Sequence, residues 1–530
     1  MLFFAFIISA DQYYVAESGN DGNDGSPGSP WATIGKAVGS GSPAKAGDQI
    51  TVRTGAYSAA QINFGKSGAA GNPITLKAEA NVIVNSTGQN GFNISQQHDW
   101  IIDGFRLNTV PHWGIAVWGC TNIIIRNCYI YKAGASAIIA IVSNFGTNDM
   151  YPVPQLWNIK VLNNTLDQAN WSSGDNEGIS IWATDGFEVA GNRLINCQRE
   201  GIDIKTGSRN GSVHHNMIIG QLNKWSGTGM GVYIDGWHYE TFNIDVYSNL
   251  IQESEEGFEI NCEDCAKGDA SAGVHDVRIF NNIVWGSKDL TQQSWKGRCM
   301  SLYNFPSGRV SRIHVFNNTF AGAGVAGIWI ENANLQDMFV RNNIIVNNNG
   351  NDVNIVSGSG IIVENNILST QPRNAAGATV RNNTIASPQF ADSGAHDYHL
   401  KSTSPAVDAA YGTDVAAFDY DSTARPQGMS ADIGAFEYTN ASVNFPRERP
   451  GAAAALSSRG CSIVICDIAG RTMRKFEAGD AAGGLPARWL RDLAKGVYII
   501  STNRYAAAGY AAMRITLSSP PARRPGLCRQ

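Results

Sequence analysis

The sequence has little charge, and it lacks the charge pattern of a nucleic-acid or membrane-surface protein. Charged residues make up 16% of the 530 residues, and the formal net charge is −5. A chain of this composition has no excess of basic residues that would bind nucleic acid. It also has no basic amphipathic helix of the kind that binds membrane surfaces. After the first ten residues no apolar run is long enough to cross a bilayer. We therefore expect neither a nucleic-acid partner nor a membrane span.

Cysteine is sparse, and its spacing argues against a structural zinc site. The chain has nine cysteines, of which Cys262 and Cys265 form a CxxC pair. No second CxxC accompanies this pair, and the two acidic residues between its members are poor neighbours for zinc. A local disulfide, or two unrelated stacked cysteines, fits better, so no metal ligand is predicted. Four further cysteines at strand-like positions should pack as small apolar residues: Cys120, Cys128, Cys197 and Cys299.

The first ten residues, MLFFAFIISA, are apolar and end on a small residue before Asp11. This segment resembles the end of a secretory signal peptide with cleavage near Ala10, although it lacks a positively charged start. The sequence therefore predicts an exported protein.

Glycine is abundant, with 57 residues, and it opens a phrase that recurs through the chain. At 201–205, 231–235 and 257–261, a Gly is followed by strictly alternating apolar and variable residues. Such alternation predicts a β-strand with one buried face. The same phrase or a close variant of it recurs at 114–118, 137–141, 178–182, 299–303 and 327–331.

A second mark, an apolar-variable-apolar run ending in Asn or Asn-Asn, repeats between about residues 73 and 387. Repeated strands without long intervening helices cannot form a doubly wound sheet, and they predict an all-β parallel β-helix. The marking asparagines should be structural, because Asn tolerates left-handed turns and stacked Asn side chains can hydrogen-bond along a ladder. These residues are Asn127, Asn164, Asn192, Asn216, Asn249, Asn282, Asn318, Asn343, Asn366 and Asn383.

Both flanks of the repeat carry motifs that resemble known proteins. The opening YYVAESGNDGNDGSPGSPWATIGKAVGSGSPAKAGDQITVRTGAY resembles the start of secreted right-handed β-helix proteins of the pectin-lyase-like superfamily. In that superfamily a strand and a short helix, here around 34–38, cap the solenoid. The stretch DYHLKSTSPAVDAA…DYDSTARPQGMSADIGAFEY resembles the C-terminal cap of exported bacterial β-helix proteins. The resemblance implies a right-handed solenoid and an extracellular carbohydrate-active protein.

The last part of the chain, CSIVICDIAGRTMRKFEAG…WLRDLAKGVYIISTN, resembles the small β-sandwich sorting domain of proteins exported by type IX secretion. This resemblance implies delivery outside a bacterial cell or to its surface through the secretion machinery. The expected organisation is a signal-peptide remnant (1–10), an N-terminal cap with the first coils (11–72), β-helix repeats (73–387), a C-terminal cap (388–438), a linker (439–459), the sorting domain (460–518) and a disordered tail (519–530).

If the three Gly-led strands are successive rungs, their variable residues form two outward columns with about 4.8 Å between rungs. One column holds Asp203, Tyr233 and Glu259, and the next holds Lys205, Asp235 and Asn261. A merely hydrophilic surface would also carry charges. However, the same columns are apolar, small or aromatic on the rungs above and below, which favours a functional site on an exposed sheet.

Aromatic residues flank these acids and suggest sugar-binding platforms. Pyranose rings bury their apolar faces on aromatic rings, while their hydroxyls bond to carboxylates. The alternation places Trp118 and its column mates outside, and exposed aromatics in a line suggest a ligand. The proposed platforms are Trp182, Trp225, Trp237 and Tyr303, with Asp203 and Asn261 as further substrate contacts.

The carboxylates predict cleavage of glycosidic bonds. Asp235 and Glu259 should lie on neighbouring rungs, displaced by one outward position, and Glu263 follows on the next loop. Glycoside hydrolysis needs two carboxyl groups about 5 Å apart in retaining enzymes and about 6.5 to 9.5 Å apart in inverting enzymes. We expect Asp235 to act as nucleophile or base and Glu259 or Glu263 as the acid. The substrate would be a plant or algal cell-wall polysaccharide, cleaved by a monomer.

The phrase GVYIDGW…GFEINCED is similar to that of a β-helical xylosidase family whose Asp and Glu stand on successive coils. Asp235 matches this pattern, whereas Asn261 stands at the position directly below it. The acid must then come from Glu259 or Glu263.

Two alternatives remain open. Lys205, Tyr233, Asp235 and His238 resemble the grouping of alginate epimerases and lyases, and could support β-elimination on a uronate polymer, with Ca²⁺ as a cofactor of that alternative alone. The paired Asp-Asp typical of calcium-bearing pectate lyases is not found here. The third interpretation is a non-catalytic glycan-binding or adhesin β-helix, in which replacing Asp235 or Glu259 would change nothing.

Overall fold

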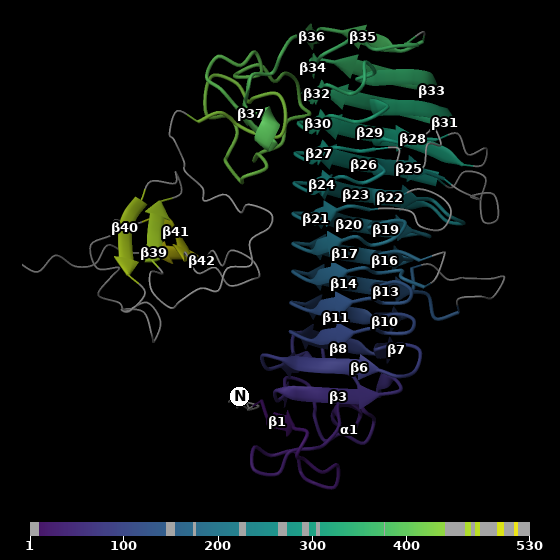
Figure 1. Cartoon of the computed structure of the whole chain (residues 1–530), viewed down its shortest axis with the longest axis vertical. Helices are drawn as coiled ribbons and strands as arrows, with labels where there is room; N and C mark the ends of the chain where they lie inside the picture. Colours follow the sequence, from purple (N-terminus) through teal and green to yellow (C-terminus); the bar gives the residue numbers. More distant parts are fainter. Residues whose placement is uncertain are drawn as a thin grey trace, which may run out of the picture. The chain divides into compact units, whose positions relative to one another are not determined.

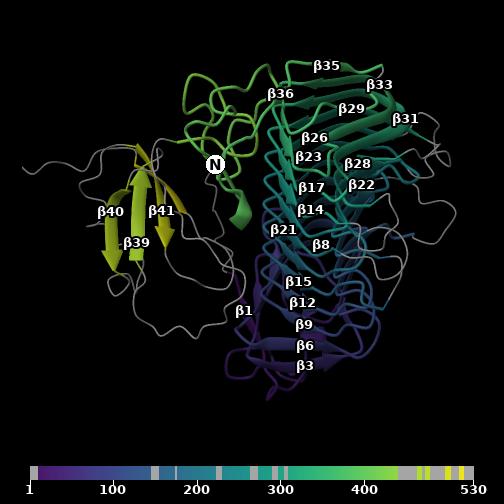
Figure 2. The ribbon, with the colours of Figure 1, turned by 45° about the horizontal axis from the view of Figure 1, so that its top comes forward.

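The computed structural model describes residues 10–144, 154–172, 176–221, 229–262, 273–288, 296–303, 308–375 and 377–439, together with the strands of the C-terminal part. The chain divides into two compact units, Met1–Ala441 and Ser442–Gln530. The first unit is a parallel β-helix, as the repeats predicted (Figure 1). Its coils follow the chain order from one end of the solenoid to the other (Figure 2).

Equivalent strands of successive coils pair in parallel, which produces three stacks. The first stack contains β1 (Gln12–Val15), β2 (Gln49–Val52), β5 (Ile74–Ala78), β8 (His98–Asp103), β11 (Thr121–Arg126), β14 (Leu156–Leu162), β17 (Thr184–Ala190), β20 (Arg209–His214), β23 (Thr241–Tyr247), β26 (Gly273–Phe280), β29 (Arg309–Phe316) and β35 (Thr379–Arg381). The second contains β4 (Ile62–Phe64), β7 (Phe92–Ser95), β10 (Ile115–Trp118), β13 (Ile138–Ile141), β16 (Ile179–Trp182), β19 (Ile202–Lys205), β22 (Met230–Asp235), β25 (Glu256–Asn261) and β28 (Arg298–Leu302). Two long strands, β31 (Ala326–Arg341) and β33 (Val353–Glu364), continue both stacks.

The third stack lies along another side of the solenoid. It contains β3 (Gly55–Ala59), β6 (Val82–Ser86), β9 (Arg106–Asn108), β12 (Tyr129–Tyr131), β15 (Thr165–Asp167), β18 (Arg193–Ile195), β21 (Met217–Ile219), β24 (Leu250–Gln252), β27 (Ile283–Trp285), β30 (Thr319–Ala321), β32 (Ile344–Val346), β34 (Ile367–Leu368) and β36 (Thr384–Ile385). The inward side chains of all three stacks form one continuous apolar core.

A short helix, α1 (Ile34–Val38), lies where the sequence predicted it. Thr33 caps its N-terminus by accepting a hydrogen bond from the Lys36 amide, and Ile34, Ala37 and Val38 are buried. A capped helix with an apolar face covers the first coils and keeps water from the solenoid core.

The Gly-led phrase has a steric cause at the entry to the second stack. A Cβ on Gly201 would lie 2.7 Å from the carbonyl oxygen of Gly231, and a Cβ on Gly231 would lie 2.7 Å from that of Gly257. Both distances are shorter than a carbon-oxygen contact allows, so a side chain would push successive coils apart. Glycine therefore marks most of these corners, with Ala137 and Cys299 in its place on two rungs, and the apolar residues that follow it, such as Ile202 and Ile204, enter the core.

The predicted asparagine ladder runs through the core side of the coils. In each step the side-chain oxygen of one Asn accepts from the amide and the side-chain nitrogen of the Asn one coil earlier; Asn249 Oδ1, for example, accepts from Asn216 N at 3.0 Å and from Asn216 Nδ2 at 2.9 Å. Asn127 is an exception, because it adopts a left-handed φ of 56° and the adjacent Cys128 takes the ladder position. Asn127 is therefore structural as a left-handed turn residue, one position before the ladder.

We expect Asn249→Ala to destabilise the protein by about 1–3 kcal/mol, the cost of leaving a buried polar group unsatisfied. The substitution removes the acceptor for Asn216 and the donor to Val213 O and Asn282 Oδ1. Chemical denaturation should report the loss. Asn63→Ala, at an exposed position of β4, should change stability by about 0.5 kcal/mol or less. Equal effects of the two substitutions would contradict a stabilising ladder.

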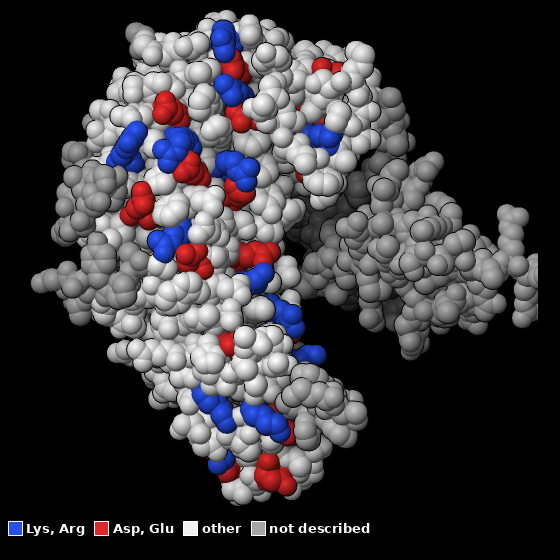
Figure 3. Space-filling view, turned by 180° about the vertical axis from the view of Figure 1, so that it is seen from behind, with Lys and Arg blue, Asp and Glu red and all other residues white. Residues whose placement is uncertain are grey.

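Opposite charges pair across rungs on the outer faces. Arg209 Nε lies 3.0 Å from Asp185 Oδ2, and Arg312 Nε lies 2.6 Å from Asp276 Oδ1. Figure 3 shows basic and acidic side chains interleaved on one face of the molecule. Such exposed pairs contribute little stability each, but they keep the surface mixed in sign.

The segment after the repeats packs against the side of the β-helix. It contains a hairpin of β37 (Phe390–Asp392) and β38 (Asp397–Leu400), joined by the 3₁₀ helix η2 (Ser393–Ala395). Its apolar residues, including Ile433 and Phe436, pack on outward residues of the third stack such as Ile344 and Ile367. This packing buries an apolar face that the coils alone would leave to water.

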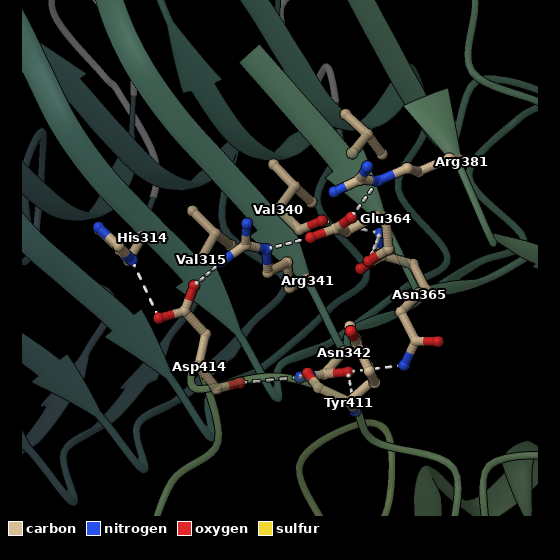
Figure 4. Close-up of polar contacts among 12 residues, drawn as sticks. His314, Val315, Val340, Arg341, Asn342, Glu364, Asn365, Arg381, Tyr411 and Asp414 are labelled. Carbon is tan, nitrogen blue, oxygen red and sulfur yellow. Dashed lines mark hydrogen bonds and ion pairs between the residues drawn. The ribbon is translucent and has the colours of Figure 1, made fainter. Parts of the chain in front are cut away.

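Polar contacts hold this segment to the first stack (Figure 4). Asp414 bridges His314 Nδ1 at 3.1 Å and Arg341 Nη1 at 2.8 Å. The turn residue Asn342 donates to the carbonyls of Tyr411 and Asp414 and accepts from the Tyr411 amide. The left-handed turn asparagines therefore serve as docking groups for the segment.

His399 should make this segment sensitive to alkaline pH. Burial alone would lower the pKa of His399, but hydrogen bonds to Asp421 and Asp397 outweigh burial and raise it from 6.5 to about 9. A raised pKa stabilises the fold below pH 6.5, and the stabilisation is lost as pH rises through 9. The difference in unfolding midpoint between wild type and His399→Gln should therefore shrink over this range. A pH-independent difference would contradict the charged pair.

In the second unit, the described strands β39 (Ser462–Asp467), β40 (Thr472–Glu477), β41 (Gly496–Thr502) and β42 (Met513–Leu517) form an antiparallel sheet in the order β40-β39-β41-β42. The expected signal peptide up to residue 9, most of the linker and the tail lie outside the described residues. Across the part of the chain that is described, no helix is long and apolar enough to span a membrane.

Candidate functional site

The outward face of β16, β19, β22, β25 and β28 brings the predicted site residues together. The register pairs Asp203 with Tyr233 and Tyr233 with Glu259, so these residues form one column. Trp182 pairs with Lys205, and Asp235 pairs with Asn261, in the next column. The side chains of Ile204, Ile234 and Ile260, which alternate with them, lie in the core. The columns are therefore those that the alternation predicted.

The acids of this face are outward but withdrawn from water. The exposed fractions are 0% for Asp203, 2% for Asp235 and 3% for Glu259. The expectation of an exposed, hydrated sheet is thus wrong, because neighbouring outward side chains pack against one another. Desolvation strengthens every charge interaction at such a face.

One cluster gathers around Lys205. Its Nζ lies 2.8 Å from Glu177 Oε1 and also forms an ion pair with Asp203 Oδ2. Burial opposes ionisation of Glu177, but Lys205 outweighs it and lowers the pKa of Glu177 below its ordinary value. Burial, together with Glu177 and Glu200, raises the pKa of Asp203 well above its ordinary value, although Lys205 acts in the opposite direction. Lys205 therefore contacts both carboxyls, and the pKa shifts of the two acids have opposite directions.

A third outward column was missed in the sequence. Glu177, Glu200 and Glu256 each precede the corner glycine of a rung, and the register places Arg298 beside Glu256. Burial raises the pKa of Glu200 to about 7 and that of Glu256 to about 8. The Glu-Gly pair that opens three of the alternating runs was the available signal, and its Glu lies one residue before the Gly at which each phrase was taken to begin.

The upper rungs form a second polar cluster. Ser301 Oγ donates to Glu256 Oε2 at 2.6 Å, and Asn261 Nδ2 donates to Glu259 Oε1. The Arg298 guanidinium hydrogen-bonds the Tyr303 hydroxyl and lies 4.3 Å from the centre of the Trp329 ring. Burial raises the pKa of Tyr303, so its hydroxyl stays protonated. These contacts hold the side chains beside Glu259 in fixed positions.

The aromatic platforms are less open than predicted. Trp182 is outward but only 6% exposed, because Trp237 packs against its ring at 5.2 Å and Lys205 lies 5.0 Å from the ring centre. Trp237 and Trp118 are partly buried on the edge of the same apolar cluster. The cluster continues the outward face beyond the charged rungs, so apolar and charged surfaces adjoin.

The remaining predicted residues have mixed outcomes. Tyr233 and His238 are buried, and the carbonyl of Asp235 accepts from Thr241 Oγ1 at 2.9 Å. Glu263 and Trp225 lie outside the described residues.

Cys262 is disulfide-bonded, while Cys120, Cys128, Cys197 and Cys299 are free and buried, as predicted for apolar packing. Among the described residues no three His, Cys, Asp or Glu side chains are grouped to hold a metal ion.

Comparisons with known proteins agree with the fold. Residues 13–204 match the family described as the Pel9A-like right-handed β-helix region, so the solenoid is right-handed as predicted. The structure of XylC with xylose has a TM-score of 0.54 at 14% identity and covers 81% of this chain and 98% of its own. Pectate lyase Pel9A has a TM-score of 0.45 at 17% identity, and the match covers 82% of this chain and 98% of the pectate lyase. A tailspike protein of E. coli bacteriophage HK620 has a TM-score of 0.48 at 13% sequence identity, and the match covers 64% of this chain and 64% of the tailspike chain. No curated protein is significantly similar in sequence.

Proposed function

We propose that the protein is a carbohydrate-active enzyme that hydrolyses glycosidic bonds of a plant or algal cell-wall polysaccharide. The register that places Asp235 one rung and two residues from Glu259 is the observation that carries this proposal. With about 4.8 Å between rungs and about 3.3 Å per residue, their backbones lie about 8 Å apart. Side chains at this separation can meet either the retaining or the inverting geometry of a carboxyl pair.

In this proposal Asp235 is the ionised member that attacks the anomeric carbon or activates water, and a neighbouring carboxyl donates the proton. Lys205, Tyr233, His238 and Asn261 surround the pair, and Trp182, Trp237 and Tyr303 bind the sugar rings. Burial of these groups supports acid-base chemistry, because a desolvated carboxyl can hold a proton near neutral pH. The likeness in fold to a protein solved with xylose supports a sugar ligand.

The state of Lys205 favours hydrolysis over elimination. A lysine that removes the C5 proton of a uronate must first be neutral. Burial lowers the pKa of Lys205, but Asp203, Glu177 and Glu200 outweigh burial and raise it above the ordinary value. The lysine therefore remains charged. β-Elimination is kept as the second candidate because the first coils match a family named after a pectate lyase.

Incubation with a panel of plant and algal polysaccharides tests the proposal. Hydrolysis releases reducing ends without the ultraviolet absorbance of an unsaturated uronate, and this is the expected result. Reducing ends with absorbance would support the lyase alternative, and loss of that activity with a calcium chelator would show that it depends on a metal ion. No cleavage of any substrate would contradict an enzyme and leave glycan binding. Export through the C-terminal domain and a monomeric state are further proposals that secretion assays and light scattering can test.

A further inference from the structure

Two residues of opposite charge, Glu256 and Arg298, lie on neighbouring rungs of the second stack. The register places Arg298 directly beside Glu256, so about 4.8 Å separates their backbones. Both residues are buried, with 0% of Glu256 and 2% of Arg298 exposed. Two buried charges at this spacing normally pair with each other, because pairing offsets the cost of removing each charge from water.

In the described structure the two side chains do not hydrogen-bond to each other but turn to different neutral groups. Glu256 Oε2 accepts from Ser301 Oγ at 2.6 Å, whereas Arg298 Nη1 donates to the Tyr303 hydroxyl. Glu256 Oε1 and Arg298 Nε are both buried without a hydrogen-bond partner. An acceptor and a donor on adjacent rungs are therefore left to be satisfied by a group from outside the chain.

Trp329 brings this pair to the surface of the solenoid. It pairs in register with Ser301, and the centre of its ring lies 4.3 Å from the Arg298 guanidinium carbon. Its Nε1 donates to Glu331 Oε2 at 2.9 Å, which fixes the orientation of the indole. Trp329 and Glu331 are both partly exposed, so the rung reaches solvent beside Arg298. A fixed, partly exposed indole is suited to pack on the apolar face of a sugar ring.

A sugar hydroxyl matches the two unpartnered atoms. A hydroxyl can donate to Glu256 Oε1 and accept from Arg298 Nε at the same time. A carboxylate of a uronic acid can only accept, and it would place a further negative charge beside Glu256 on a strand that also carries Glu259. The surroundings therefore favour an uncharged sugar over a uronate.

We infer that Glu256, Arg298 and Trp329 form a binding subsite for an uncharged sugar unit, whose hydroxyl bridges Glu256 and Arg298 while its ring packs on Trp329. The inference rests on the proposed function and names its substrate class, a neutral glycan. Trp329 lies two rungs from Glu259, about 10 Å along the solenoid. The subsite therefore holds a sugar unit beside the proposed point of cleavage.

Calorimetric titration of the full chain tests the substrate class. The Asp235→Asn variant keeps the oligosaccharide intact during the measurement. Neutral hexasaccharides of xylose, glucose, mannose, galactose and arabinose are compared with hexasaccharides of galacturonate and mannuronate. At least one neutral hexasaccharide should bind, and the uronate hexasaccharides should bind at least about tenfold more weakly, the loss of a well-formed hydrogen bond. Tighter binding of a uronate hexasaccharide, or no binding of any neutral one, would overturn the inference.

An arginine-to-lysine exchange tests the role of Arg298. Arg298→Lys keeps the positive charge but removes Nε and the planar guanidinium. Affinity for the neutral hexasaccharide should fall about 10- to 100-fold, the effect of losing a hydrogen bond to a charged group. Arg278→Lys is the matched control, because Arg278 is 57% exposed and pairs with Asp245 on the first stack, and should leave affinity unchanged. Unchanged affinity in folded Arg298→Lys would overturn the inference and leave only ordered water at the unpartnered atoms.

Monodeoxy analogues of the bound hexasaccharide separate a direct contact from a structural role. Removing the bridging hydroxyl should weaken binding when Arg298 is present and have little further effect in Arg298→Lys, because its partner is already absent. Additive losses at every hydroxyl would overturn the inference. If Arg298→Lys fails to fold, as judged by circular dichroism, Glu256→Gln replaces it with an expected loss of about 2- to 10-fold. Gln can still accept from Ser301, and unchanged affinity in this variant would also overturn the inference.

These outcomes separate the inference from the proposed function. Hydrolysis of a neutral glycan that depends on Asp235, with KM unchanged in Arg298→Lys, would refute the inference and leave the function intact. Binding of a neutral hexasaccharide that depends on Arg298, without release of reducing ends by wild type, would refute hydrolysis and leave the subsite.

Discussion

Replacing Asp235 with asparagine is expected to lower kcat/KM for the best polysaccharide substrate by about 10⁴-fold or more, the range found when a central catalytic group is removed. The exchange keeps the shape of the side chain and its place opposite Asn261, but it removes the charge that must attack the anomeric carbon or activate water. Initial rates of reducing-end release measure the effect.

The interpretation of Asp235→Asn depends on an intact fold. Asp235 is only 2% exposed, so an unfolding midpoint close to that of wild type must accompany the activity loss. Asp245→Asn removes a carboxylate from the following strand, where Asp245 pairs with Arg278 on an outer face, and should retain activity. If Asp235→Asn keeps activity within about tenfold of wild type, Asp235 does not take part in the bond cleavage.

The fold could be predicted because its cause is local in the sequence. Alternation fixes which side chains of each strand face inward, and the corner glycines fix where each strand begins. Glycine is required where a Cβ would meet the carbonyl of the next coil, as at Gly231. The columns containing Asp203 and Asp235 follow from these two rules, and the register agrees with them.

The protonation states of the site could not be predicted in the same way. They depend on how the ammonium of Lys205 is shared between Glu177 and Asp203, and that depends on contacts between coils. Glu177 is 28 residues from Lys205 in the chain, yet it holds the lysine at 2.8 Å. Alternation also says nothing about how far outward side chains cover one another, which is why Trp182 was expected to be exposed.

The upper part of the site depends on an ion pair that the sequence did not reveal. Glu255 precedes Glu256, and its Oε2 lies 3.0 Å from Lys296 Nζ, with both side chains 1% exposed. The same oxygen accepts from the Gly229 amide at 2.7 Å. This pair links the turns before β22, β25 and β28, and thereby fixes the start of the strand that carries Glu256 and Glu259.

Lys296→Met is accordingly expected to destabilise the β-helix by about 3–5 kcal/mol, because it leaves the buried Glu255 carboxylate without a counter-ion. Denaturant unfolding at neutral pH measures the loss.

Two further variants separate charge from packing. Glu255→Gln combined with Lys296→Met should recover most of the stability, because Gln can still accept from the Gly229 amide while no charge remains buried. Lys288→Met removes a lysine that is 57% exposed and lies 3.9 Å from Glu253, and should change stability by about 1 kcal/mol or less. If the double variant were as unstable as Lys296→Met alone, the ion pair between Glu255 and Lys296 would itself be stabilising. The rungs of the site would then depend on the two charges, and the neutral hydrogen bond from the Gly229 amide to the introduced glutamine could not replace them.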